Sequence, residues 1–310
     1  MTPTTAIHDF HRLRPRLHGI AYRMLGSVAE AEDLVQDIWL RWNASHHAAI
    51  ASADAWLVSA TTRLSIDRLR SATAMRQAYA GIWLPEPRLD QAPATPEQTQ
   101  ELADDVSVAF LVLLERLEPD ARAAFLMREV FDAEYSEVAD MLGKSEAACR
   151  QIVSRARAAV QAGDRRRAVA PAVHARLLRG FAEALSRGDF GAIHALLADD
   201  AELVGDGGGK VTSFPRPLQG GRRIAQLYYA AALRHGPAMR IAQVRLNGRP
   251  ALLRFIDGAL ESAQSFEFDG ERVVLVHVQR NPDKLQRIAA ACAAGDATPA
   301  EAGGSRPFSG

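Results

Sequence analysis

Apolar side chains recur at every third or fourth position over residues 8–75, which is the spacing of helices that bury one face. Ser27 followed by Glu30 three residues later is typical of a capped helix start. A further helix is predicted from about Asp54, and the same periodicity returns over residues 106–165. Both segments are therefore predicted to be all-α. The clearest periodic sets are Leu17, Ile20, Ala21, Met24 and Leu25, and then Leu34, Val35, Ile38, Trp39 and Trp42.

The later part of the chain has a different pattern. Helical spacing over residues 173–198 and 222–234 gives way to alternation of apolar and polar positions. Asn-Gly and Asp-Gly dipeptides separate the alternating stretches and supply the positive φ values that tight hairpin turns need. Helices followed by an antiparallel meander predict a separate α+β domain over residues 172–290. The alternating stretches are Arg240–Leu246, Arg249–Ile256, Ala259–Phe268 and Arg272–Gln279.

Two segments lack either periodicity. Residues 76–105 are acidic and contain four prolines, so we expect a linker there. Residues 291–310 are rich in Ala, Gly and Ser, and we predict a disordered tail. The expected organisation is thus a helical module at 8–75, the linker, a second helical module at 106–165, the α+β domain and the tail.

Composition narrows the class of protein. The chain has 310 residues, of which 48% are hydrophobic and 24% charged, as in soluble proteins of two or three domains. No apolar run approaches the roughly 20 residues that span a bilayer, and no secretory leader is visible, so we expect a cytoplasmic protein. Cys149 and Cys292 lie far apart, which argues against a disulfide framework or a zinc cluster, and we expect no cofactor. The net charge is zero, but a basic stretch at 144–167 could bind a polyanion.

The strongest candidate for chemistry is a predicted helix at Tyr135–Leu142, followed by a sharp turn at Gly143. Ser145 is placed to cap a second helix, on which Cys149 and Val153 are predicted to point inward. This pattern favours a helix-turn-helix whose second helix enters a DNA major groove. An ordinary helical hairpin with a solvated basic face fits the spacing equally well. The side chains predicted to point outward are Glu146, Arg150, Gln151, Ser154, Arg155 and Arg157.

Both helical modules resemble those of one family. Residues 10–70, with RLHGIAYRMLGSVAEAEDLVQDIWLRW and AWLVSATTRLSIDRLR, closely resemble region 2 of bacterial sigma factors. Residues 110–157 resemble region 4 of the extracytoplasmic-function (ECF) group. The resemblance implies an alternative sigma factor that binds core RNA polymerase and directs initiation at specific promoters, with no catalytic groups of its own. The residues implied to bind the polymerase are Asp33, Leu34, Gln36, Asp37 and Trp39.

The same resemblance implies two contacts with promoter DNA. The segment around Thr61, with Arg63, Asp67 and Arg68, would melt and read the −10 element. Ile152 takes a position that is often basic in relatives, which leaves the individual −35 contacts open. The residues implied to read the −35 element are Ser145, Glu146, Arg150, Gln151, Ser154 and Arg155.

Residues 172–290 resemble the SnoaL-like branch of the cone-shaped NTF2-like fold, which includes polyketide cyclases and small-ligand binders. Sigma factors with this extension form a subgroup in which the domain restrains the sigma modules in cis while part of it supports activity. The linker carries acids and the apolar Trp83 and Leu84, which can dock beside a loop containing Lys210 or Lys284, so we expect an intramolecular contact between the domain and the sigma modules. The alternative is an independent domain on a flexible tether. The three signatures of the subgroup are Trp83-Leu84-Pro85-Glu86-Pro87, Asp206-Gly207-Gly208-Gly209-Lys210 and Asn281-Pro282-Asp283-Lys284-Leu285.

Several residues also fit a purely structural role or a different function. Trp39, Trp42 and Trp56 fit core packing, and Cys149 fits a small buried side chain better than a redox sensor. The rival function is an isomerase or cyclase, or a small-molecule binder, attached to a DNA-binding module. Its acid and base groups would be His194, Asp199, Asp206 and His277, although nothing in the sequence shows that they converge. An unknown small ligand and the oligomeric state are left open.

Overall fold

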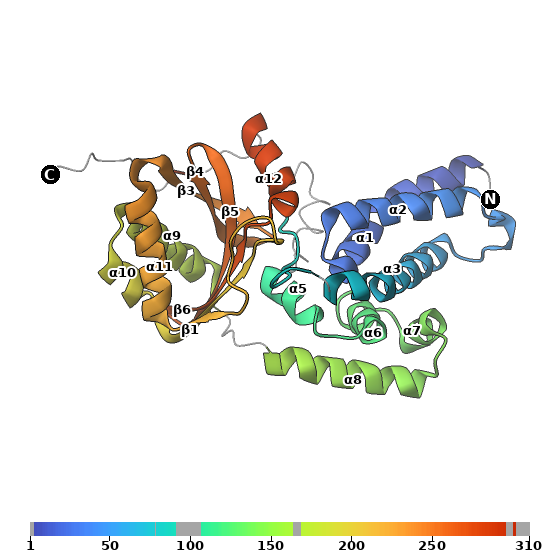
Figure 1. Ribbon diagram of the computed structural model, residues 1–310. Helices are drawn as coiled ribbons and strands as arrows, with labels where there is room; N and C mark the ends of the chain where they lie inside the picture. Colours follow the sequence, from blue (N-terminus) through green and yellow to red (C-terminus); the bar gives the residue numbers. More distant parts are fainter. Residues whose placement is uncertain (1–2, 78, 91–106, 164–168, 296–299, 302–310) are drawn as a thin grey trace. The chain divides into compact units, whose positions relative to one another are not determined.

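The computed structural model describes residues 3–77, 79–90, 107–163, 169–295 and 300–301 (Figure 1). The chain divides into two compact units. Of the described residues, the first unit contains 3–77 and 110–163, and the second contains 79–90, 107–109, 169–295 and 300–301. The segment after residue 78 therefore packs with the carboxy-terminal half of the chain.

The first unit is helical, as the periodicity predicts. Ser27 caps one helix by accepting a hydrogen bond from the Glu30 backbone N–H at 3.4 Å. Trp42 is fully buried, and its indole donates to the Ala6 carbonyl at 2.8 Å. The helices are α1 (Pro3–Leu25), α2 (Val28–Asn43), α3 (Ala53–Gln77), α5 (Val108–Leu114), α6 (Pro119–Glu129), α7 (Tyr135–Leu142) and α8 (Glu146–Gly163), with a 3₁₀ turn at His47–Ala49.

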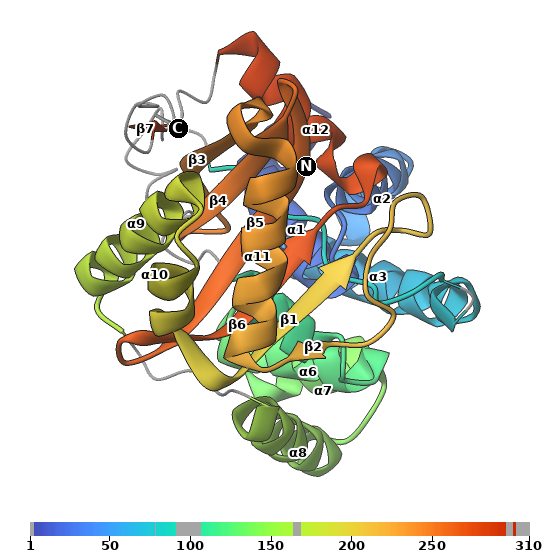
Figure 2. The same ribbon diagram turned by 60° about the vertical axis from the view of Figure 1, so that its left-hand side comes forward.

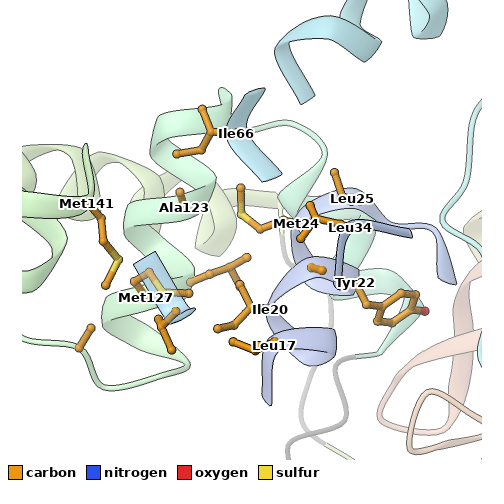
Figure 3. Close-up of a cluster of buried hydrophobic side chains, with 14 of the residues drawn as sticks. Leu17, Ile20, Tyr22, Met24, Leu25, Leu34, Ile66, Ala123, Met127 and Met141 are labelled. Carbon is orange, nitrogen blue, oxygen red and sulfur yellow. The ribbon is translucent and has the colours of Figure 1, made fainter. Parts of the chain in front are cut away.

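One hydrophobic core joins the two helical modules. Figure 3 shows Ile20 and Met24 of α1 facing Ala123 and Met127 of α6. Ile20 and Met24 are both fully buried, and Met127 is almost so. Each buried side chain of this size stabilises the folded state by about 1.5–3 kcal/mol, so the shared core holds the helices of this unit together.

The second unit is built on a seven-stranded sheet with the order β2-β1-β6-β5-β4-β3-β7. Strand β1 runs parallel to β6, and the other neighbours are antiparallel. Asn247 and Asp257 each have a φ of 50° at the hairpin turns, as their sequence predicts. The strands are β1 (Leu197–Asp206), β2 (Leu218–Gln219), β3 (Met239–Leu246), β4 (Arg249–Ile256), β5 (Ala259–Asp269), β6 (Arg272–Gln279) and β7 (Ala300–Glu301).

Each face of this sheet is covered. Figure 2 shows α9 (Pro171–Arg187), α10 (Phe190–Ala195) and α11 (Gly221–His235) across one face. A second apolar cluster on β3, β4 and β5 includes Leu285 and Ile288 of α12 (Pro282–Ala294), with Leu89 packed against it. The predicted class, two all-α modules followed by an α+β domain, is confirmed.

The start of the tail needs correction. Helix α12 continues to Ala294, so residues 291–294 are helical rather than disordered. Cys292 extends the apolar face of this helix by one turn, and Gly295 with a φ of 77° ends it. The rest of the predicted tail lies outside the described residues, apart from β7. The other domain boundaries remain a prediction. Within the described ranges, no helix is both long enough and apolar enough to cross a membrane.

Candidate functional sites

Helices α7 and α8 form the predicted helix-turn-helix. The Glu134 backbone N–H donates to the Glu137 side chain at 2.8 Å, in a capping box that starts α7. Gly143 ends the helix with a φ of 63°, in the left-handed region that favours glycine. The Ser145 Oγ then accepts a hydrogen bond from the Ala148 N–H at 3.3 Å. Ser145 therefore satisfies a backbone donor at the start of α8.

The inward face of α8 is apolar. Cys149, Val153, Ala156 and Val160 are buried. Burial raises the pKa of the Cys149 thiol, so it stays neutral and packs as a small hydrophobic group. Ile152 is half-buried against the same core, which gives it a packing role.

The outward face of α8 is polar and exposed. Arg150 pairs with Glu146 at 2.8 Å, and its guanidinium lies 4.8 Å from the centre of the Tyr135 ring. The Arg155 Nε donates to the Gln151 carbonyl at 3.4 Å, within the same helix. These contacts are local, so the guanidinium groups can reach another molecule. Arg157, also predicted to point outward, is exposed but pairs with Glu129 of α6 at 2.6 Å. The other exposed side chains of this face are Glu146, Arg150, Gln151, Ser154 and Arg155, as the sequence predicts.

The proposed −10 residues on α3 lie in different surroundings. Arg63 donates to the carbonyls of Met141 at 3.1 Å and Asp140 at 2.6 Å, at the carboxyl end of α7. Asp67 is largely exposed, with 69% of its side chain accessible. Thr61 is fully buried, so it cannot contact DNA in this arrangement. Arg63 and Asp67 line a groove of about 850 Å³, together with Trp56.

Arg68 links the two predicted surfaces of this module. Its guanidinium pairs with Asp37 at 2.5 Å and also donates to the Glu30 carbonyl at 2.9 Å. One residue assigned to DNA is therefore bonded to one assigned to the polymerase. The pair joins α3 to α2 within the first unit.

The predicted polymerase residues on α2 divide between two faces. Leu34 is fully buried in the core, so its implied contact with the polymerase is not supported, because its side chain already packs inside. Trp39 is half-buried, with its ring centre 4.8 Å from that of Phe10. The outward positions of this helix are spaced by three, one and three residues. The last of them is Leu40, which is 59% exposed and is not among the residues that the resemblance implies. This outward face consists of the exposed Asp33, Gln36 and Leu40 and the half-exposed Asp37, which pairs with Arg68.

The three signatures of the second unit meet around Asp206, which is fully buried at the end of β1. Its carboxylate accepts hydrogen bonds from the Tyr79 hydroxyl at 2.7 Å and the Leu84 backbone N–H at 3.0 Å. The Lys284 ammonium lies 2.8 Å from Asp206, 2.6 Å from the Leu84 carbonyl and 4.1 Å from the centre of the Trp83 ring. Burial and the bond to Asp206 raise the pKa of Tyr79 above its ordinary range, so its hydroxyl keeps its proton. A buried charge persists only with such partners.

The remaining contacts of Asp206 come from its own domain. The Gly208 N–H donates at 2.9 Å, and the Gln279 side chain donates at 3.2 Å. Gln279 also donates to the Leu84 and Pro85 carbonyls, each at 3.4 Å. Both oxygens of the carboxylate thus accept hydrogen bonds. Two of its donors, Gln279 and Lys284, also donate to carbonyl groups of the linker backbone.

The glycines have a steric role. Gly208 and Gly209 have φ values of 63° and 69°. A Cβ on Gly208 would lie 2.4 Å from the Asn281 side chain, and one on Gly209 would lie 2.8 Å from the Ala80 Cβ. Asn281 in turn donates to the Tyr79 hydroxyl at 2.9 Å. Only residues without a side chain let the loop come this close to the linker.

The linker continues along the domain to residue 90. Arg88 and Asn247 exchange two hydrogen bonds of 2.9 Å, and the Asp90 N–H donates to the Arg245 carbonyl at 3.0 Å. Glu86 is 5% exposed, and its carboxylate lies 3.7 Å from Arg287. Residues 79–90 therefore form part of the second unit.

The four residues of the rival enzyme do not form a site. Asp206 is enclosed by the linker, and Asp199 is exposed on β1. His194 stacks on Phe190 at 5.9 Å, and His277 is buried in β6. None of the four lines the cavity of about 590 Å³ that the same domain contains.

Comparisons with known proteins agree with the helical modules. The model of sigma-70 region 2 matches residues 10–75, and that of sigma-70 region 4 matches residues 107–160. The ECF RNA polymerase sigma factor SigJ of Mycobacterium tuberculosis is 39% identical over 235 residues, which is 75% of each chain. The probable ECF sigma factor SigI of the same organism is 29% identical over 292 residues, covering 93% of this chain and 97% of its own.

The fold as a whole has a solved counterpart. The crystal structure of Mycobacterium tuberculosis SigJ covers 90% of this chain and 98% of its own, with a TM-score of 0.73 at 33% identity. The likeness therefore extends through both units.

Proposed function

This chain belongs to the ECF RNA polymerase sigma factors. We propose which of its residues bind the polymerase, which bind promoter DNA and how its second unit acts on both. The chain is a promoter-directing alternative sigma factor, and its relatives are transcription factors rather than enzymes. Core RNA polymerase and promoter DNA are accordingly its partners.

Region 4 reads the −35 element with the outward face of α8. The exposure of Arg150, Gln151, Ser154 and Arg155 supports this assignment, because base edges are reached only by side chains that face the groove. Ser145 and Glu146 lie at the start of α8, where the Ser145 hydroxyl caps the helix and the Glu146 carboxylate can accept a hydrogen bond from a cytosine amino group. Ile152 takes no part, since it packs inward.

Region 2 binds the polymerase through the outward face of α2. Asp33, Gln36 and Asp37 supply polar contacts, and Leu40 adds an exposed apolar side chain at the same face. Arg63, Asp67 and Arg68 contribute to the −10 contact from α3. The Arg68–Asp37 pair supports a coupling of the two surfaces. DNA that binds Arg68, or polymerase that binds Asp37, must compete with the ion pair between these two side chains.

The second unit acts in cis by holding the linker between the two sigma regions. The observation that carries this proposal is the buried Asp206 carboxylate, which bonds Tyr79 and Leu84 of the linker and Lys284 of the NPDKL segment. Tethering gives an effective concentration on the order of millimolar, so even weak contacts populate the held state. Fixing residues 79–90 limits how regions 2 and 4 can be arranged on the polymerase.

Run-off transcription with purified core polymerase tests the proposal. Three proteins are compared: the full chain, a chain ending at residue 280 and a chain ending at residue 165. The chain ending at 280 lacks Lys284 and should transcribe more than the full chain, whereas the chain ending at 165 should transcribe less than the chain ending at 280. Equal transcription from all three would contradict cis control, and no promoter-specific transcription from any of them would contradict the sigma assignment.

A further inference from the structure

The second unit contains a cavity that the sigma function does not use. Its volume is about 590 Å³, within the usual range for sites that hold small organic molecules. Helix α11, strands β1, β4, β5 and β6, and the loop at residues 212–214 form its walls. Much of the lining is apolar and comes from Leu203, Phe214, Leu227, Ile256 and Val278.

The polar part of the lining includes a charged cluster. The Glu261 carboxylate accepts from the Arg254 Nε at 2.7 Å and pairs with Arg280 at 2.6 Å. Arg254 and Glu261 are mostly buried, with 13% and 16% of their side chains exposed. Burial alone would raise the pKa of Glu261, but Arg254 and Arg280 outweigh it and hold the pKa below its usual range.

This arrangement makes Glu261 a poor proton acceptor. The group stays ionised at neutral pH, and each of its oxygens already receives an arginine. A general base needs a pKa near the working pH and a free lone pair directed at its substrate. Glu261 therefore orients the two arginines, and the chemistry of the cavity suits binding rather than proton transfer.

The charges do not balance within the cavity. Arg254 and Arg280 together carry two positive charges against the single charge of Glu261, and Arg234 of α11 adds a third cation to the lining. The Arg280 guanidinium also donates to the Thr212 carbonyl, which offsets none of its charge, and 30% of its side chain stays exposed. A compact negative group on a ligand would offset the excess positive charge by pairing with the exposed part of this guanidinium. A cationic ligand would be repelled.

We infer that this cavity binds a small amphipathic anion, with an apolar body and one carboxylate, sulfonate or similar head group. The body lies against the apolar wall, and the head lies near Arg280 and Arg254. This inference is independent of the cis control proposed above, because it concerns binding to the cavity and not transcription.

Two naphthyl dyes of the same body provide the test. 1-Anilinonaphthalene-8-sulfonate carries one negative charge, and N-phenyl-1-naphthylamine has the same rings without it. Fluorescence titration of the full chain should give saturable binding with one sulfonate dye per chain, and a Kd at least tenfold lower than that of the neutral dye. Equal affinities, or no saturable binding of either dye, would overturn the inference.

Variants locate the dye. Arg280→Gln should reduce the preference for the anionic dye to less than threefold, while Arg272→Gln, an exposed arginine outside the cavity lining, should leave it unchanged. Ala231→Trp fills the cavity from α11 and should weaken both dyes at least tenfold. Circular dichroism melting checks that each variant is folded.

If Arg280→Gln does not fold, Arg234→Gln on the exposed part of the lining replaces it, and we expect a smaller loss of the preference for the anionic dye. Dye binding that survives Ala231→Trp in a folded protein would place the site elsewhere and refute the inference.

Discussion

The outward face of α8 and the surroundings of Asp206 are both rich in charge, but they satisfy it in opposite ways. On α8, Arg150 pairs with Glu146 one turn away, and the two side chains are 55% and 47% exposed. Asp206 is fully buried, and its partners Tyr79 and Lys284 are 127 and 78 residues away in the chain. The exposed polar groups on α8 remain available to another molecule, whereas the buried groups around Asp206 already bond to one another in the folded chain. The charge of a segment therefore indicates a binding surface only when its local partners and exposure are known.

The largest expected effect is on the stability of the second unit. Asp206→Ala leaves the Lys284 ammonium beside the linker without its counter-ion, which should cost about 3–5 kcal/mol. Hydrogen exchange of the β1 and β6 amides measures this loss in the full chain. The matched control is Lys210→Ala, which removes an ion pair with Asp283 whose side chains are 55% and 54% exposed and should cost less than about 1 kcal/mol. Equal losses in the two variants would remove the distinction drawn between buried and exposed charge.

A buried group without an ion partner should behave differently again. Burial lowers the pKa of His174 from its ordinary 6.5 to about 4. The folded state therefore resists protonation, so the stabilising contribution is complete above pH 6.5 and is lost as the pH falls to 4. The loss should be on the order of 2–3 kcal/mol, because one pKa unit corresponds to about 1.4 kcal/mol.

His174→Phe keeps the ring contact with Phe268 and removes the titration. Urea unfolding between pH 7 and pH 4 should show a smaller fall in stability for this variant than for the wild type. Parallel pH profiles would mean that His174 is accessible to protons in the folded state.

On α8 the expected effects appear in DNA binding and not in stability. Arg150→Ala and Arg155→Ala should each weaken binding to the selected −35 element by about 1–3 kcal/mol if the contact is to a base. A phosphate contact would instead weaken binding to all sequences alike. Fluorescence anisotropy with cognate and scrambled duplexes, using protein bound to core polymerase, separates these cases. Wild-type affinity in both variants would contradict the assignment of this face.

The smallest effect concerns the start of the same helix. Ser145→Ala removes the acceptor for the Ala148 N–H and should destabilise α8 by about 1 kcal/mol. Thermal melting of the full chain detects this change. Ser145→Asp should restore the stability because aspartate also caps helices, and a failure of this rescue would argue that Ser145 acts by another route.

Local patterns account for what the sequence predicts well. The spacing of Cys149 and Val153, the turn at Gly143 and the cap at Ser145 are all properties of neighbouring residues, and the structure agrees with each of them. The predicted polymerase surface is less accurate, since the same helical period that identifies α2 places Leu34 in its core.

Long-range contacts could not be predicted in the same way. The sequence offers Asp206 as a catalytic acid or as part of a signature, and nothing near it in the chain indicates Tyr79 or Gln279 as its partners. Arg254, Glu261 and Arg280 likewise lie on separate strands or strand ends and are brought together only by the pairing of β4 with β5 and of β5 with β6. Such sites depend on the register of the sheet, which the local pattern does not specify.

The most direct test of cis control changes Asp206 in the otherwise complete chain. Promoter-specific transcription by core polymerase is measured for the wild type, Asp206→Asn and the control Lys210→Met, after hydrogen exchange has shown that the sheet of the second unit remains folded. The account predicts a several-fold rise in transcription for Asp206→Asn, because the linker loses the carboxylate that holds Tyr79, Leu84 and Lys284, and no change for Lys210→Met. Wild-type transcription from a folded Asp206→Asn protein, in which the linker amides exchange faster, would contradict it.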